Sequence, residues 1–222
     1  MTNTPSTERN DLAEALTMHR QLLRQTAAGL FDEQARSRST ASELSVGGII
    51  KHVAATEKSW ADFMVDGGGA GSDSDIDWSN PDPAVIAAYQ AGFQRLDTET
   101  LAGVLADYEE VAAATDRLVL ELPDLDRSFP LPPAPWFPPG ATRSVRRTIV
   151  HIIAETAQHA GHADIIRETI DGAKTMGSRP AILRPEVRRR RRRARRLRLM
   201  TRAPLRNLLK RRGRSATRRR RG

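Results

Sequence analysis

Cysteine is absent from the 222 residues of the chain. This absence excludes disulfide bonds, thiolate metal ligands and a cysteine nucleophile, so any sulfur chemistry would need a thiol carried in by a substrate. Long apolar runs are also absent, since none approaches the roughly 18 residues that span a bilayer. The polar N-terminal stretch MTNTPSTERNDLAEA contains no apolar core for a secretory signal. We therefore expect a soluble cytoplasmic protein without a membrane span.

The net charge of +9 is distributed very unevenly along the chain. Residues 1–172 carry 14 of the 36 Lys and Arg residues and 26 of the 27 Asp and Glu residues, which leaves 22 basic residues and 1 acidic residue for 173–222. The sequence therefore predicts an acidic globular domain over 1–172 and a strongly basic tail over 173–222. Each part needs its own explanation.

Apolar residues repeat at three- and four-residue spacing in four stretches, which predicts amphipathic helices over 8–30, 44–66, 84–121 and 144–171. In the third helix, we interpret polar breaks near Thr98 and Thr100 as a kink. Ser144 is a candidate N-cap of the fourth helix, and Gly172 closes it. The proline-rich stretch 123–143 is expected to be a structured loop, and no stretch shows strand alternation. The expected fold is all-α, a four-helix bundle.

Three polar side chains fall on the apolar faces of two of these helices. His52 lies on the same side of the second helix as Ile49 and Val53, and Glu155 and His159 lie one turn apart on the fourth. A buried carboxylate and imidazole are costly unless something satisfies them, and one divalent metal ion could bind both groups. Two structural alternatives stay open: His52 as a hydrogen-bonded core histidine, and Glu155 with His159 as an ordinary i,i+4 pair.

Two further histidines, His151 and His162, lie on the neighbouring side of the fourth helix. Either could replace a metal ligand, support a ligand from behind, or line the rim of a pocket. Both are also candidate catalytic bases, although nothing in the sequence fixes which of them takes that role.

The strings GGIIKHVAATEKSW and VHIIAETAQHAGHADIIRETIDG resemble the two signature helices of the DinB-like superfamily, and more closely those of its DUF664 branch, the mini-circle proteins. The resemblance covers about residues 8–172. It implies an up-down-down-up four-helix bundle with a divalent metal, zinc or nickel, at one end. Many members use three histidines, but Glu155 replaces the first of the H-x-x-x-H pair here. The match therefore shifts to the His/Glu/His set of mycothiol-dependent maleylpyruvate isomerase, which implies His52, Glu155 and His159 as the ligands.

Several members of the superfamily are thiol S-transferases that use mycothiol or bacillithiol, so the resemblance implies a low-molecular-weight thiol and an electrophilic small molecule as substrates. The chain lacks the second domain of the isomerase, which argues against that particular reaction. A metal-dependent hydrolase would use the same kind of open metal position, and a metal-binding protein without turnover is a further alternative. A homodimer is also compatible with this reading.

The basic tail contains the runs RRRRRRARRLR, KRRGR and RRRR without any aromatic residue between them. Runs of like charge repel one another, so we expect a disordered or partly helical segment. It could bind nucleic-acid phosphates without sequence preference, but it lacks the aromatic side chains that stack on bases. An incidental extension of the domain and a contact with an anionic surface are the alternatives.

Overall fold

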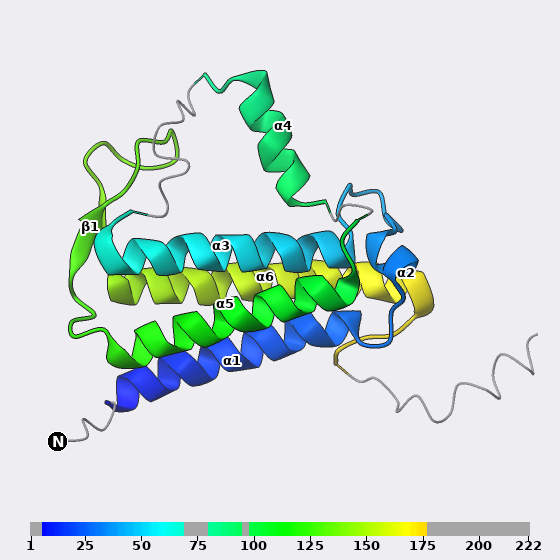
Figure 1. Ribbon diagram of the computed structural model, residues 1–222, viewed down its shortest axis with the longest axis horizontal. Helices are drawn as coiled ribbons and strands as arrows, with labels where there is room; N and C mark the ends of the chain where they lie inside the picture. The colour runs from blue at the N-terminus through cyan, green and yellow to red at the C-terminus, as the bar shows by residue number, and fades with distance from the viewer. Residues whose placement is uncertain (1–5, 69–79, 95–97, 177–222) are drawn as a thin grey trace, which may run out of the picture. The chain divides into compact units, whose positions relative to one another are not determined.

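The computed structural model of the protein describes residues 6–68, 80–94 and 98–176, all within the first of the two units into which the chain divides, Met1–Gly177. Within these ranges the chain forms α1 (Thr7–Ala27), α2 (Asp32–Arg36), α3 (Val46–Asp66), α4 (Pro83–Gly92), α5 (Leu101–Glu121), β1 (Ser128–Pro130), β2 (Thr142–Ser144) and α6 (Val145–Asp171) (Figure 1). Almost all of the predicted basic tail, from residue 177 onward, lies outside the described residues. Its predicted nucleic-acid binding and the domain boundary after residue 172 therefore stay predictions.

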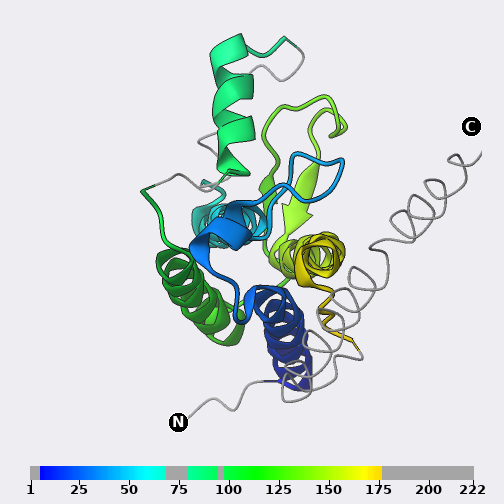
Figure 2. The same ribbon diagram turned by 90° about the vertical axis from the view of Figure 1, so that its right-hand side faces the viewer.

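Helices α1, α3, α5 and α6 pack side by side as a bundle (Figure 1 and Figure 2). One buried cluster joins the last turns of α1 and α6 to the first turns of α3 and α5: Leu23, Ala27, Val46, Leu101 and Ile166. A second cluster joins the opposite ends of the same helices: Leu16, Phe63, Val119, Val145 and Ile149. The helices α1 and α6 therefore run in one direction and α3 and α5 in the other, which confirms the all-α fold with up-down-down-up order.

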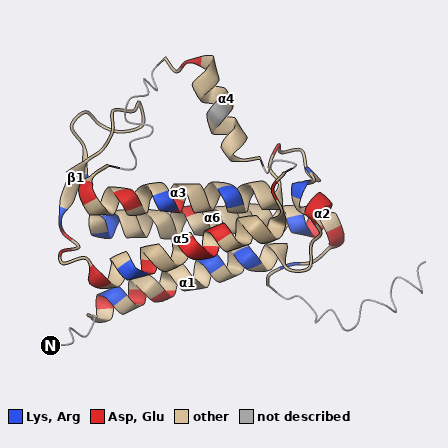
Figure 3. Cartoon of the chain, in the orientation of Figure 1, with Lys and Arg blue, Asp and Glu red and all other residues tan. Residues whose placement is uncertain are grey.

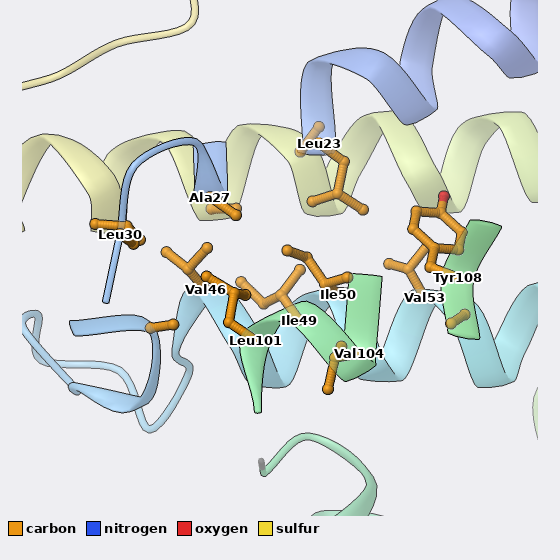
Figure 4. Close-up of a cluster of buried hydrophobic side chains, with 14 of the residues drawn as sticks. Leu23, Ala27, Leu30, Val46, Ile49, Ile50, Val53, Leu101, Val104 and Tyr108 are labelled. Carbon is orange, nitrogen blue, oxygen red and sulfur yellow. The ribbon is translucent and has the colours of Figure 1, made fainter. Parts of the chain in front are cut away.

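The apolar face of α3 forms the centre of the bundle. Figure 4 shows Ile49, Ile50 and Val53 of this helix directed toward Leu23 of α1 and Tyr108 of α5, and all of them are buried. Burial of a side chain of this size contributes roughly 1.5–3 kcal/mol to folding. The three- and four-residue spacing that predicted the second helix thus corresponds to the face that packs against the other helices.

Arg167 of α6 donates hydrogen bonds to the C-terminal end of α1. Its buried side chain donates from Nη1 to the backbone carbonyls of Thr26 and Ala28, at 2.7 and 2.8 Å, and forms an ion pair with Asp171 at 3.0 Å. The last carbonyl groups of a helix have no donor within the helix itself. A side chain 139 to 141 positions away in the sequence therefore supplies two of the hydrogen bonds that α1 cannot make for itself.

A buried ion pair crosses the middle of the bundle. Arg20 of α1 and Glu57 of α3 are 3% and 1% exposed, and Nη2 of the arginine lies 2.6 Å from Oε1 of the glutamate. The Nη1 group of Arg20 also lies 2.6 Å from the Asp116 carboxylate of α5, which is 37% exposed. Neither Arg20 nor Glu57 was singled out by the sequence, because each could equally have been placed at a helix edge.

The predicted third helix, 84–121, was wrong as a single element, because it is two helices. Helix α4 begins after the N-cap Asp82, whose carboxylate accepts from the Ala84 amide, and ends at Gly92. Thr100 is not the site of a kink but the N-cap of α5, and its hydroxyl accepts from the amide of Gly103 at 3.0 Å. A threonine that caps a helix adopts extended backbone dihedrals, which separates the two helices despite the continuing apolar repeat.

The connection between α5 and α6 contains the two short strands, although the sequence predicted none. Strands β1 and β2 pair antiparallel, with Phe129 opposite Arg143, and a hydrogen bond of 2.8 Å from Leu131 to Ala141 extends the pairing. The rest of the proline-rich stretch is a loop, as predicted, because proline cannot donate to a ladder. Ser144, at the end of β2, caps α6 by accepting from the Arg147 amide at 3.1 Å.

Charged residues are spread along the bundle helices, whereas α4 itself contains none, and only its N-cap Asp82 is acidic (Figure 3). Across the described ranges, every helix is too short or too polar to serve as a membrane span.

Candidate metal centre

His52 of α3 and Glu155 and His159 of α6 lie together where these two helices face each other. Each offers one potential ligand atom, and the three atoms lie within 4.8 Å of one another. The imidazole rings of His52 and His159 meet edge to face, with 5.0 Å between their centroids. The structure thus brings together all three of the residues that the sequence proposed, since both helices turn the expected face toward each other.

The His52 ring contacts an aromatic ring and a hydroxyl group. Its ring stacks on the Phe93 ring, with 3.7 Å between centroids and 18° between planes, and its Nε2 lies 3.4 Å from the Thr56 hydroxyl. Burial, together with the nearby His159, lowers the pKa of His52 to about 4. At neutral pH the imidazole is therefore uncharged, and a lone pair on its ring is free to bind a cation.

Glu155 lies between two histidines of its own helix. Its carboxylate oxygens are 3.6 Å from Nε2 of His159 and 3.8 Å from Nε2 of His151, distances that are too long for hydrogen bonds. The neighbouring imidazole of His159 lowers the pKa of Glu155, and burial opposes this effect. The carboxylate is therefore ionised at neutral pH, in a site where its side chain is only 30% exposed.

The donor set fits a divalent metal ion. Two imidazole nitrogens and a carboxylate oxygen are the ligand types that zinc and related cations take in proteins. Nδ1 of His159 is also buried without a hydrogen-bond partner among the described residues, and a buried polar atom in this state is unusual. The neutral His52, the ionised Glu155 and the short distances between the three groups are what such a cation requires.

His151 and His162 lie outside this cluster, on opposite sides of it. The His151 ring packs edge to face against Trp60, with 5.0 Å between centroids. The centroid of the His162 ring is 5.5 Å from that of His159, and Nδ1 of His162 is buried without a partner in the described part of the chain. Of these two histidines, His151 therefore lies next to both the Glu155 carboxylate and the Trp60 ring.

Phe93, which covers His52, was not predicted, because it belongs to the connection between α4 and α5. Two features fix that connection on α3. A Cβ atom on Gly48 would lie 1.9 Å from the carbonyl oxygen of Phe93, so only glycine allows this approach. Lys51 donates to the Gln94 carbonyl at 3.3 Å and pairs with Glu99 at 2.7 Å. The glycine pair in the string GGIIKH was the signal that could have indicated a close backbone approach.

A surface hollow of about 570 Å³ lies elsewhere, between the end of α1 and the start of α5. Its walls include Arg24, Phe31, Leu105 and Glu109, and none of the three clustered residues lines it. The hollow is wide and open to solvent, and an ion pair joins Arg24 to Glu109 in its wall. The convergence of donor atoms between α3 and α6, rather than the size of a hollow, identifies the candidate site.

Residues 11–172 match the family described as Mycothiol-S-transferase. A solved structure described as a conserved protein from Enterococcus faecalis is similar in fold, with 15% sequence identity and a TM-score of 0.48, and the match covers 73% of this chain and 96% of that chain. No curated protein matches the chain.

Proposed function

Because the chain belongs to the mycothiol-S-transferase family, within the DinB-like superfamily, we propose that it is a metal-dependent enzyme that transfers a low-molecular-weight thiol such as mycothiol to electrophilic small molecules. The family match extends over residues 11–172 and so includes both helices that carry the candidate site. The single observation that supports this function most is the convergence of His52, Glu155 and His159 to within 4.8 Å.

In this proposal the three residues hold one divalent cation, with zinc as the first expectation and nickel as the second. Three protein ligands are the number found in catalytic zinc sites, which keep a further position for a substrate. A cation bound there would supply a thiolate nucleophile at neutral pH, because a positive charge stabilises the ionised thiol.

In this proposal a residue beside the cluster accepts the proton that the reaction releases. A sulfur–carbon bond forms, the bond from carbon to the leaving group breaks, and the leaving group departs with the electron pair. The thiol proton must go to a base, and His151 is the better placed of the two candidates, since it lies beside Glu155 and Trp60. Burial lowers the pKa of His151, so its imidazole is neutral and able to accept a proton.

The proposal is tested by elemental analysis and by thiol conjugation, measured on purified wild-type protein, His52→Ala, His159→Ala and the control His19→Ala. His19 lies on α1, outside the cluster. Wild type and the control should contain about one metal ion per chain and form conjugate from mycothiol and a test electrophile, whereas the two site variants should lose both. Full conjugation by metal-stripped wild type would overturn the proposal.

The same measurements separate the alternatives. Metal in the wild type without conjugation, together with cleavage of an ester or amide, would indicate a hydrolase at the same site. Metal without either reaction would indicate a protein that binds the ion and does not turn over.

A further inference from the structure

Arg143 is an arginine that the thiol-transfer proposal does not use. It lies in β2, where its pairing with Phe129 fixes its backbone, and directly before Ser144, the N-cap of α6. Its guanidinium carbon lies 4.5 Å from the centroid of the Trp60 ring and 5.5 Å from that of Phe137. A residue from the hairpin is therefore held against an aromatic side chain of α3.

The guanidinium is incompletely satisfied in this position. Its Nη1 is buried and has no hydrogen-bond partner in the part of the chain that the structure describes. Rings that cover a guanidinium interact with its flat faces, whereas its N–H groups point outward in its own plane. An arginine whose faces are covered by rings and whose Nη1 lacks an acceptor is prepared to bind a planar acceptor edge-on, and a carboxylate fits that geometry with two parallel hydrogen bonds.

Arg143 is connected to the candidate metal site by a short series of contacts. Trp60 lies between Arg143 and His151, and the ring centroids of Trp60 and His151 are 5.0 Å apart. His151 in turn lies 3.8 Å from the Glu155 carboxylate.

The opposite side of the cluster is less suited to a second substrate. Phe93 stacks on the ring of His52 there, and Gly48 holds the backbone of Phe93 against α3. The side of Glu155 that carries His151, Trp60 and Arg143 contains polar groups that a ligand could use. An electrophile that reacts at the cluster would therefore extend toward Arg143.

We propose that Arg143 binds a carboxylate group of the electrophilic substrate, so that the protein prefers electrophiles that carry a carboxylate close to the reacting carbon. This inference rests on the proposed thiol transfer. The arginine takes no part in bond making. It holds the carboxylate while the sulfur–carbon bond forms and the leaving group departs with the electron pair of its bond, and the carboxylate is unchanged at the end.

A pair of small electrophiles tests the preference. Iodoacetate and iodoacetamide both lose iodide to a thiol, and they differ in the presence of a carboxylate. Their kcat/KM values with mycothiol, each divided by its uncatalysed rate constant, are compared in the metal-loaded wild type, Arg143→Met and Arg143→Lys. Loss of a charge-assisted hydrogen bond should lower the value for iodoacetate about ten- to a hundredfold in Arg143→Met, and leave iodoacetamide within about twofold.

Arg143→Lys and a control variant make the comparison sharper. Arg143→Lys keeps a cation near Trp60 but lacks the planar fork, so it should lose most of the same preference if two parallel hydrogen bonds are needed. Arg127→Met is the matched control, because Arg127 lies 4.6 Å from the ring centroid of Phe129 in the same hairpin and is exposed. It should behave as wild type toward both electrophiles.

Calorimetric titration with propionate and propionamide provides a readout that needs no turnover. Wild type should bind propionate in preference to propionamide, and Arg143→Met should lose that difference. Equal losses of kcat/KM on both electrophiles, or unchanged propionate binding in Arg143→Met, would overturn the inference. If wild type conjugates neither electrophile but binds propionate through Arg143, the thiol-transfer proposal fails and the carboxylate site stands.

Discussion

The carbonyl oxygen of Phe93 occupies the space in which any side chain at Gly48 would begin, only 1.9 Å from an ideal Cβ position. The first turn of α3 and the connection between α4 and α5 are therefore in direct backbone contact. The same contact places the Phe93 ring on the ring of His52, one turn further along α3.

Gly48→Ala should consequently destabilise the protein, because the added methyl group must displace a backbone carbonyl. We expect a loss of about 1–3 kcal/mol in the free energy of unfolding, measured by urea denaturation. Gly161→Ala is the control, since nothing lies within 4 Å of a Cβ at this position inside α6, and it should stabilise the protein by roughly 0.5–1 kcal/mol. Equal stability of Gly48→Ala and wild type would show that the contact is not tight.

The buried pair of Arg20 and Glu57 should be much more sensitive to loss of one partner than to loss of both. Glu57→Leu leaves the arginine with Asp116 alone and should cost about 3–5 kcal/mol of unfolding free energy. Adding Arg20→Met should recover a large part of that loss, because Asp116 is 37% exposed and can be solvated. A double variant less stable than Glu57→Leu, in the same denaturation experiment, would contradict this expectation.

The exposed contact between Glu8 and Arg146 predicts a dependence on pH. A hydrogen bond from Arg146 lowers the pKa of Glu8 below 4.5. The stabilisation from this contact is therefore present above pH 4.5 and is lost as the pH falls through the lowered pKa. In a carboxyl NMR titration, Arg146→Gln should return the pKa of Glu8 toward 4.5, whereas Arg147→Gln should not move it. An unchanged pKa in Arg146→Gln would refute the assignment of its cause.

The two remaining histidines of α6 should differ in their effect on conjugation. If His151 accepts the thiol proton, His151→Gln should lower kcat by about 10²-fold or more at unchanged metal content. His162→Gln should stay within a few-fold of wild type, since His162 lies beside His159 and away from Trp60. If His162→Gln lowers kcat and His151→Gln does not, His162 is the base instead of His151. Loss of metal in either variant would make that histidine a ligand.

Much of the fold could be predicted because each helix is encoded by a pattern of residues that lie close together in the sequence. The apolar repeat of α3 and α6 fixes which side of each helix is buried, and this in turn fixes that His52, Glu155 and His159 face the same space. Ser144 and Gly172 mark the ends of α6 by the chemistry of helix caps, and both positions are confirmed by the structure.

The parts that escaped prediction depend on contacts between distant segments. The apolar repeat continues through the break before Thr100, so periodicity alone could not separate α4 from α5. The stacking of Phe93 on His52 and the pairing of Arg20 with Glu57 join residues 41 and 37 positions apart, and no local pattern encodes them. The hairpin strands are three residues long, too short for an alternation to be seen.

The hydrogen bonds from Arg167 to the end of α1 bear on how the chain folds as it is synthesised. The two carbonyls belong to Thr26 and Ala28, and their donor lies 139 to 141 positions later in the chain, so it emerges from the ribosome only after nearly the whole domain has been made. We expect the final turn of α1 to stay frayed on any nascent chain that stops short of residue 167. Helix α1 thus emerges before the other helices of the bundle and is among the last of them to become complete.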